Sequence, residues 1–340
     1  VRRRKMENLV NSSPLILVLV FLVIGFAFLM KGADFFVEGS SSIAKRLKVP
    51  PIIIGLTIVA MGTSLPETAV SVTASLVNNN ELAVSNVVGS NIFNLMVVVG
   101  VCSILTPILV QKETIKRDIP FSMICAFLLL GLGILAVGDK SGMTLGHLDG
   151  MILLGFFAGY IVAMIQSAMK ARAAGKNVEI EGIEELEEEI GILSWPKSIL
   201  FIVGGALAIA FGGDLTVDAA SRIAIDLGMS QTLVGLTIVS IGTSLPELVT
   251  SVVAARKNEV DMAVGNAVGS NIFNILMVLG IASAINPVAL IRENIIDIVI
   301  LIVFSLIVWI YVATKRKISR KEGISMVCLY LIYAGYIIWR

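Results

Sequence analysis

Long apolar segments, repeated along all 340 residues, constrain this chain more than any other feature. An apolar stretch of about 20 residues can span a bilayer as a helix. Only 15% of the residues are charged, against about 25% in soluble domains. The segments are too long and too continuously apolar for barrel strands, so an all-α polytopic membrane protein is expected. Ten transmembrane helices are expected at residues 14–42, 51–78, 82–107, 117–138, 147–170, 196–222, 231–255, 262–287, 293–314 and 322–339.

The connections between these segments predict an orientation. Those after segments 1, 3, 5, 7 and 9 carry more than twice as many Lys and Arg residues as the other side, termini included. By the positive-inside rule they are expected in the cytoplasm, with both termini outside the cell membrane. The basic residues Arg2, Arg3, Arg4 and Lys5 argue the other way, but the internal connections outnumber them. A net charge of +1 argues against a nucleic-acid partner.

The chain contains an internal repeat, because residues 51–94 align with residues 231–274 without a gap and with more than half of the positions identical. Gly-Thr-Ser-Leu-Pro-Glu recurs at 62–67 and 242–247, and Gly-Ser-Asn-Ile-Phe-Asn at 89–94 and 269–274. Such self-similarity indicates duplicated structural units. We therefore divide the chain into a first five-helix repeat (1–170), an acidic cytoplasmic linker (171–194) and a second repeat (195–340).

Five spans per repeat is an odd number, so the second repeat is expected to enter the membrane upside down relative to the first. Inverted repeats are the architecture of many secondary transporters, whose site lies at the repeat interface near the midplane. Duplicated helices could also pack without transporting anything. That alternative explains repeated small residues, but it does not explain a repeated buried glutamate.

The repeated glutamates are Glu67 and Glu247, each in the middle of a strongly apolar helix. An ionised group there costs several kcal/mol unless it is paired or coordinated. No Lys or Arg lies in the interior of the second, third, seventh or eighth segment. The counter-charge is therefore expected from a proton or a metal cation.

The residues around each glutamate favour a metal cation. Pro66 and Pro246 have no N–H, so they leave a carbonyl of the preceding turn without its helical partner. Hydroxyls three and four positions before each glutamate share its helix face. These hydroxyls belong to Thr63, Ser64, Thr243 and Ser244. Hard cations such as Ca²⁺ take six to eight oxygen ligands, and no soft ligand for copper, zinc or iron lies nearby.

The third and eighth segments offer further polar groups. Ser90 and Asn94 are four residues apart, as are Ser270 and Asn274, so each pair lies on one helix face. Polar contacts between helices are the alternative explanation for these pairs. Asn86 and Asn266 lie one turn earlier, where they could support the ligands.

Charge balance suggests a mechanism. One Ca²⁺ neutralises two carboxylates, and so do two monovalent cations, so the two loads would compete for one site. A further Na⁺ on neutral oxygens would make the exchange electrogenic.

The paired motifs resemble the two α-repeats of the cation/Ca²⁺ exchanger superfamily, most of all prokaryotic, particularly archaeal, Na⁺/Ca²⁺ exchangers. The resemblance implies that Glu67 and Glu247 are the central Ca²⁺ ligands and also serve Na⁺. It implies main-chain ligands at the carbonyls of Ala60 and Ser240, and central amide-or-acid positions at Asn94 and Asn274. The flanking Na⁺ ligands that it implies are Thr63, Ser64, Ser90, Thr243, Ser244 and Ser270. It also implies antiport with Na⁺ and Ca²⁺ as transported ions and no cofactor. A functional monomer is expected because the chain builds its own two-fold site.

Other functions remain open from the sequence. A H⁺/Ca²⁺ exchanger on the same fold would use the same glutamates, although a hydroxyl-rich motif suits Na⁺ better than a proton. We find no motif of a metalloprotease or a nucleotide-binding loop, so an enzyme or an ATP-driven pump is not expected. A channel usually needs an oligomeric ring, whereas this chain builds a two-fold site alone. The acidic stretch at 171–194 could sense Ca²⁺, but it lacks an EF-hand loop and a solvated linker is expected.

Overall fold

A computed structural model describes residues 9–76, 80–135, 143–173, 192–229 and 240–339, and they are almost entirely helical. Eight helices in this described part are long and apolar enough to cross a membrane, and nine if one bent pair counts as a single span. The expected all-α polytopic architecture is confirmed. The count of ten is not, because the expected segment 231–255 is described only from Ser240 onwards. The acidic stretch lies almost wholly outside the described residues.

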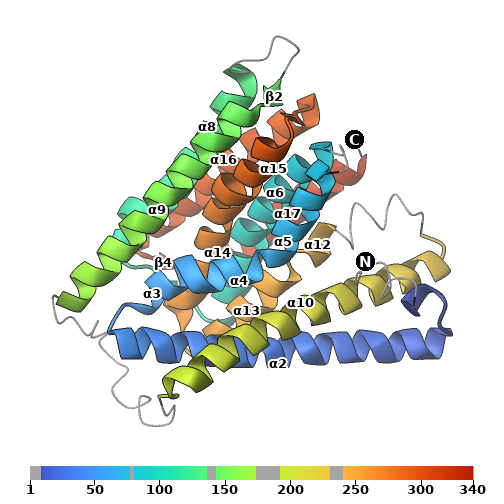
Figure 1. Cartoon of the computed structure of the whole chain (residues 1–340), viewed down its shortest axis with the longest axis horizontal. Coiled ribbons are helices and arrows are strands. Elements are labelled where there is room, and N and C mark those ends of the chain that lie inside the picture. Colours follow the sequence, from blue (N-terminus) through green and yellow to red (C-terminus); the bar gives the residue numbers. More distant parts are fainter. Residues whose placement is uncertain (1–8, 77–79, 136–142, 174–191, 230–239, 340) are drawn as a thin grey trace.

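Two very long helices lie side by side across the rest of the bundle, along the lower edge of Figure 1. They are α2 (Leu15–Leu47) and α10 (Trp195–Asp226). Their backbones nearly touch at glycines, since a Cβ built on Gly32 would lie 3.0 Å from the carbonyl oxygen of Gly205. Glycine at both positions is therefore what lets the two helices approach so closely.

The second expected segment is a broken helix. It consists of α3 (Pro51–Ile54), the π-helical turn η1 (Gly55–Val59), α4 (Ala60–Thr63) and α5 (Leu65–Leu76). The chain bends by 48° between Thr63 and Leu65. The break lies directly before Pro66, whose missing N–H predicted a kink here. The described part of its repeat mate is also broken, into α12 (Ser240–Gly242) and α13 (Leu245–Arg256).

The third and eighth segments are mostly buried helices with a π-helical turn in the middle. The first runs through α6 (Asn80–Phe93), η2 (Asn94–Val98) and α7 (Val99–Leu105). The second runs through α14 (Val260–Phe273), η5 (Asn274–Val278) and α15 (Leu279–Ile285). Both π-helical turns start at the asparagine that closes the repeated motif. Such turns are frequent at functional sites.

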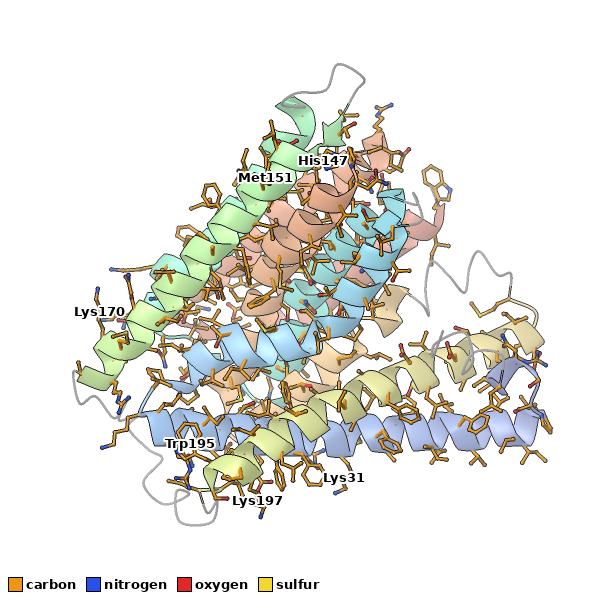
Figure 2. The ribbon with its side chains drawn as sticks, viewed as in Figure 1. Lys31, His147, Met151, Lys170, Trp195 and Lys197 are labelled. Carbon is orange, nitrogen blue, oxygen red and sulfur yellow. The ribbon has the colours of Figure 1, made fainter. Side chains whose placement is uncertain are left out.

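The remaining helices pack around this centre. They are η3 (Thr114–Asp118) with α8 (Ile119–Leu135), α9 (His147–Ala173), α16 (Arg292–Lys315) and α17 (Arg320–Trp339). Large apolar side chains are exposed on α8, α9, α16 and α17, as expected of helices in lipid, and Figure 2 labels one of them, Met151 of α9. Two short antiparallel pairings, which the apolar pattern did not predict, join connections of the two halves. They are β1 (Ile108–Leu109) with β4 (Lys317–Ile318), and β2 (Thr144–Leu145) with β3 (Val288–Ala289).

Equivalent residues of the two repeats exchange identical hydrogen bonds at the centre. The Asn91 side-chain amide donates to the carbonyl of Asn271 at 3.1 Å, and the Asn271 amide donates to the carbonyl of Asn91 at 3.1 Å. Reciprocal contacts of this kind are produced by a two-fold relation between two units. The repeated sequence thus forms a repeated structure whose halves face each other.

Candidate functional site

The two glutamates meet at the interface of the repeats. Glu67 and Glu247 lie in the first turns of α5 and α13, directly after the breaks, and both are fully buried. Ser64 donates a hydrogen bond to Glu247 Oε1 at 3.0 Å, and Ser244 donates to Glu67 Oε1 at 3.4 Å. Each carboxylate therefore accepts a hydrogen bond from a serine of the other repeat, in addition to lying beside the hydroxyls of its own motif.

Several buried polar atoms at this centre have no hydrogen-bond partner among the described residues. Unpaired polar groups are costly in an apolar interior, so such a concentration calls for an explanation. An ion that takes oxygen ligands supplies one. The unpaired atoms are Oε2 of Glu67, Oε2 of Glu247, Oγ of Ser90, both amide atoms of Asn94 and Oδ1 of Asn274.

The two threonines of the motifs also cross between repeats. Thr63 Oγ1 donates to Asn266 Oδ1 at 3.0 Å, and Thr243 Oγ1 donates to Asn86 Oδ1 at 3.3 Å. Asn86 and Asn266, which the sequence placed one turn before the serines of their motifs, thus each accept a hydrogen bond from the threonine of the other repeat.

Each of these asparagines is in turn bonded by a serine that the sequence reasoning missed. The Asn266 amide donates to Ser251 Oγ at 2.9 Å, and the Asn86 amide donates to Ser71 Oγ at 3.1 Å. The signal was present, because both serines are identical between the aligned repeats and lie one turn after the glutamates.

The other predicted ligands differ in how close the structure brings them to the glutamates. Ser270 donates to Glu247 Oε1 at 3.5 Å, so it joins the cluster. The carbonyl of Ala60 lies at the break but accepts a hydrogen bond from the Ser64 N–H at 3.0 Å. Ser240 is the first described residue of its helix.

The site holds two acidic side chains without a protein cation beside them in the part of the chain that the structure describes. Neither glutamate forms an ion pair within the described ranges. Those ranges also hold no group of three or more His, Cys, Asp or Glu side chains that is arranged to hold a metal ion. The arrangement consists of two carboxylates, hydroxyls and amide oxygens, which are the ligands of hard cations rather than of transition metals.

Membrane-spanning helices packed around two buried carboxylates define a polytopic membrane protein with an internal, anionic, oxygen-lined site. Residues 17–166 and 197–339 match the family model described as "Sodium/calcium exchanger protein". The chain belongs to this family of transporters.

Similar proteins agree with that assignment. The chain is 38% identical to the putative antiporter CaxA of Alkalimonas amylolytica, over 92% of this chain and 96% of the relative. It is 33% identical to the sodium/calcium exchanger MaX1 of Methanosarcina acetivorans, over 92% and 96%. A solved structure of the sodium-calcium exchanger NCX_Mj, soaked with Na⁺ and Sr²⁺, superposes with a TM-score of 0.79 at 31% identity, covering 95% of this chain and 99% of that one.

Proposed function

We propose that this chain exchanges Na⁺ for Ca²⁺ across the cell membrane by alternating access and so extrudes Ca²⁺. The observation that carries the proposal is the pair of fully buried glutamates, each bonded by a serine of the opposite repeat and each with an unpaired oxygen. Two carboxylates are neutralised either by one Ca²⁺ or by two Na⁺, so Ca²⁺ and Na⁺ compete for the same site. The name of MaX1 and the ions soaked into NCX_Mj support this choice of ions.

The ligands follow from the same cluster. Glu67 and Glu247 bind Ca²⁺ and also Na⁺, because only they bring charge. Neutral oxygens complete the coordination and allow a further Na⁺, which makes the exchange electrogenic. These oxygens belong to Thr63, Ser64, Ser90, Asn94, Thr243, Ser244, Ser270 and Asn274, with the carbonyls of Ala60 and Ser240.

The topology of the proposal is two inverted five-helix repeats, 1–170 and 195–340, joined by a cytoplasmic linker at 171–194. The family model supports this division because it matches one block in each half. The reciprocal Asn91 and Asn271 bonds support a two-fold relation. Both termini lie outside the cell, and one chain is the transporting unit, because it supplies both glutamates.

The test is Ca²⁺ uptake into proteoliposomes loaded with Na⁺, compared with uptake driven by a pH gradient at equal Na⁺ on both sides. We expect uptake with the outward Na⁺ gradient, together with a current. Uptake driven only by the pH gradient would instead establish a H⁺/Ca²⁺ exchanger. Na⁺-driven uptake without current would contradict electrogenic exchange.

A further inference from the structure

A cavity with a basic rim lies between η3 and α16, at the end of the molecule where β1 pairs with β4. Its volume is ≈ 650 Å³. That lies within the range of about 300–1,000 Å³ typical of small-molecule sites. Lys112, Lys116 and Arg316 line it, and all three are exposed. No function derived above uses this cavity.

The three cations have no protein counter-charge. Within the described part of the chain, none of their side chains forms an ion pair or a hydrogen bond. Glu113, the acid of this segment, does not line the cavity. Three unpaired positive charges around one cavity are complementary to an anion such as a phosphate group.

The floor of the cavity is apolar. Ile115, Pro120 and Trp309 line it together with the cations. Trp309 lies in α16, seven residues before Arg316, which caps the end of that helix; seven residues rise by about 10 Å at 1.5 Å per residue. Its indole N–H donates to the carbonyl of Ile115 at 3.1 Å, which fixes the ring. Tryptophan is enriched at membrane–water interfaces, where one part of the ring is apolar and the other polar.

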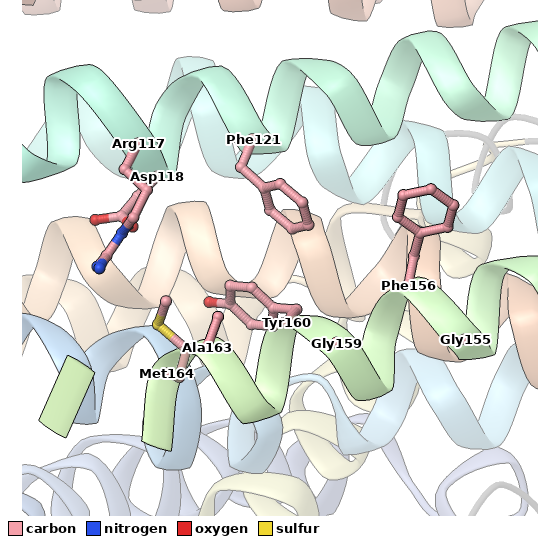
Figure 3. Close-up of a pocket in the computed structure, with 9 residues that line it drawn as sticks. All are labelled: Arg117, Asp118, Phe121, Gly155, Phe156, Gly159, Tyr160, Ala163 and Met164. Carbon is pink, nitrogen blue, oxygen red and sulfur yellow. The ribbon is translucent and has the colours of Figure 1, made fainter. Parts of the chain in front are cut away.

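The neighbouring groove shows by contrast what makes this cavity distinct. That groove, ≈ 400 Å³, lies between α8 and α9 and includes Arg117 and Asp118 (Figure 3). Arg117 bonds Asp118 Oδ1 at 2.7 Å and Ser167 Oγ at 2.8 Å. Its positive charge is therefore already neutralised, and it has none to offer a ligand.

We propose that the cavity between η3 and α16 binds an anionic phospholipid from the surrounding membrane. Lys112, Lys116 and Arg316 bind the phosphate of the headgroup, and Trp309 and Pro120 contact the upper acyl chains. The spacing of charged rim and apolar floor along the helix axes matches the change from headgroup to hydrocarbon in a lipid. Anionic lipids are concentrated in the cytoplasmic leaflet, and the positive-inside rule predicts this end of the protein there.

The test uses Trp309 as its own probe. Trp195 and Trp339 are exposed and are replaced by Phe, which leaves Trp309 as the single tryptophan. The protein is placed in phosphatidylcholine nanodiscs, and a rising fraction of phosphatidylglycerol brominated on its acyl chains is added. We expect Trp309 fluorescence to be quenched at a much lower fraction of brominated phosphatidylglycerol than of brominated phosphatidylcholine.

Removing the three cations tests whether they cause the preference for anionic lipid. The triple variant Lys112→Gln, Lys116→Gln, Arg316→Gln should lose the preference for the anionic lipid, by roughly a hundredfold at about fivefold per cation. The matched control, Lys170→Gln with Arg172→Gln, removes exposed charge from the last turn of α9 (Figure 2) but not from the cavity, and should keep it. Quenching by brominated phosphatidylcholine reports that the triple variant still exposes Trp309 to lipid.

Two outcomes would overturn the proposal. One is equal quenching by anionic and zwitterionic lipid in the unsubstituted cavity. The other is loss of the preference when millimolar inorganic phosphate is added, which would assign the cavity to a soluble phosphate instead. Neither outcome affects the exchange function proposed above.

Discussion

The two halves of the proposed ion site share residue types but differ in their hydrogen bonds. Glu247 Oε1 accepts bonds from Ser64 at 3.0 Å and from Ser270 at 3.5 Å, whereas Glu67 Oε1 accepts one from Ser244 at 3.4 Å. Ser90, the repeat mate of Ser270, also faces Glu67, but its hydroxyl makes no hydrogen bond as short as that of Ser270. The Glu247 side is therefore the more completely bonded by protein.

The asparagines show the same difference. Asn274 donates to Asn91 Oδ1 at 3.1 Å, while neither amide atom of Asn94 has a partner among the described residues. At these serine and asparagine positions the first repeat therefore has more polar atoms without a protein partner than the second, although Glu247 Oε2 and Asn274 Oδ1 are unpaired as well. The comparison predicts that equivalent substitutions have unequal effects, except at the charges themselves.

The largest effect is expected from Glu67→Gln and from Glu247→Gln. Each removes half of the charge that binds Ca²⁺, and losing one partner of a buried charge pair costs about 2–5 kcal/mol, or about 30- to 5,000-fold. Na⁺-driven ⁴⁵Ca²⁺ uptake should be nearly abolished in both variants. Retained uptake in one of them would show that the glutamates do not share a single ion. Size-exclusion chromatography provides the control for folding.

The next effect compares Ser90→Ala with Ser270→Ala. The free Ser90 hydroxyl is available to an ion, so we expect its loss to raise the Ca²⁺ concentration for half-maximal uptake by about tenfold, for about 1.5 kcal/mol. Ser270 already bonds Glu247, so its removal should raise that concentration less and lower the melting temperature more. Equal effects of the two variants on both quantities would contradict the asymmetry.

A smaller effect is expected on stability from Asn274→Ala, compared with Asn94→Ala. Removing the Asn274 amide leaves the buried Oδ1 of Asn91 without its donor, which costs about 1 kcal/mol or more. Asn94→Ala breaks no described hydrogen bond and should leave ion-free stability closer to the parent. Thermal unfolding without Na⁺ and Ca²⁺ measures both. A more destabilised Asn94 variant would reverse the comparison.

The smallest effect is expected from Lys257→Gln. Lys257 Nζ bonds the carbonyl of Asp34 at 3.1 Å and lies 3.5 Å from Asp34 Oδ1, which ties α2 to the end of α13. Both side chains are partly exposed, and such pairs contribute about 0.2–1 kcal/mol. The transport rate should change by less than about fivefold. A larger change, insensitive to ionic strength, would mean that the contact between α2 and α13 matters for transport beyond its small contribution to stability.

The sequence predicted the fold well where the geometry of a helix depends on the residues of that helix alone. Apolar length located the helices, and Pro66 predicted the break that the chain makes between Thr63 and Leu65. The limits were less accurate at the ends, since α2 continues to Leu47 beyond the expected residue 42. Ile43 and Ala44 in that extension are buried, so packing as well as hydropathy helps to hold its first residues in place.

Much of the site was predictable, because a buried glutamate in a repeated motif needs a counter-charge. The crossed bonds from Ser64 to Glu247 and from Ser244 to Glu67 were not, because helical periodicity describes one helix and not the contact between two. The cavity at Lys112, Lys116 and Arg316 was missed for the same reason. Those residues were counted one by one for orientation, while only the packing of η3 on α16 brings them together.

The central claim is that Na⁺ and Ca²⁺ compete for one site made by Glu67 and Glu247. Equilibrium binding of ⁴⁵Ca²⁺ to the purified protein, titrated with Na⁺ at constant ionic strength, measures it most directly. We predict full displacement of Ca²⁺ by Na⁺ and no Ca²⁺ binding by the Glu67→Gln, Glu247→Gln double variant. Ca²⁺ that stays bound at saturating Na⁺, or that still binds the double variant, would contradict the account.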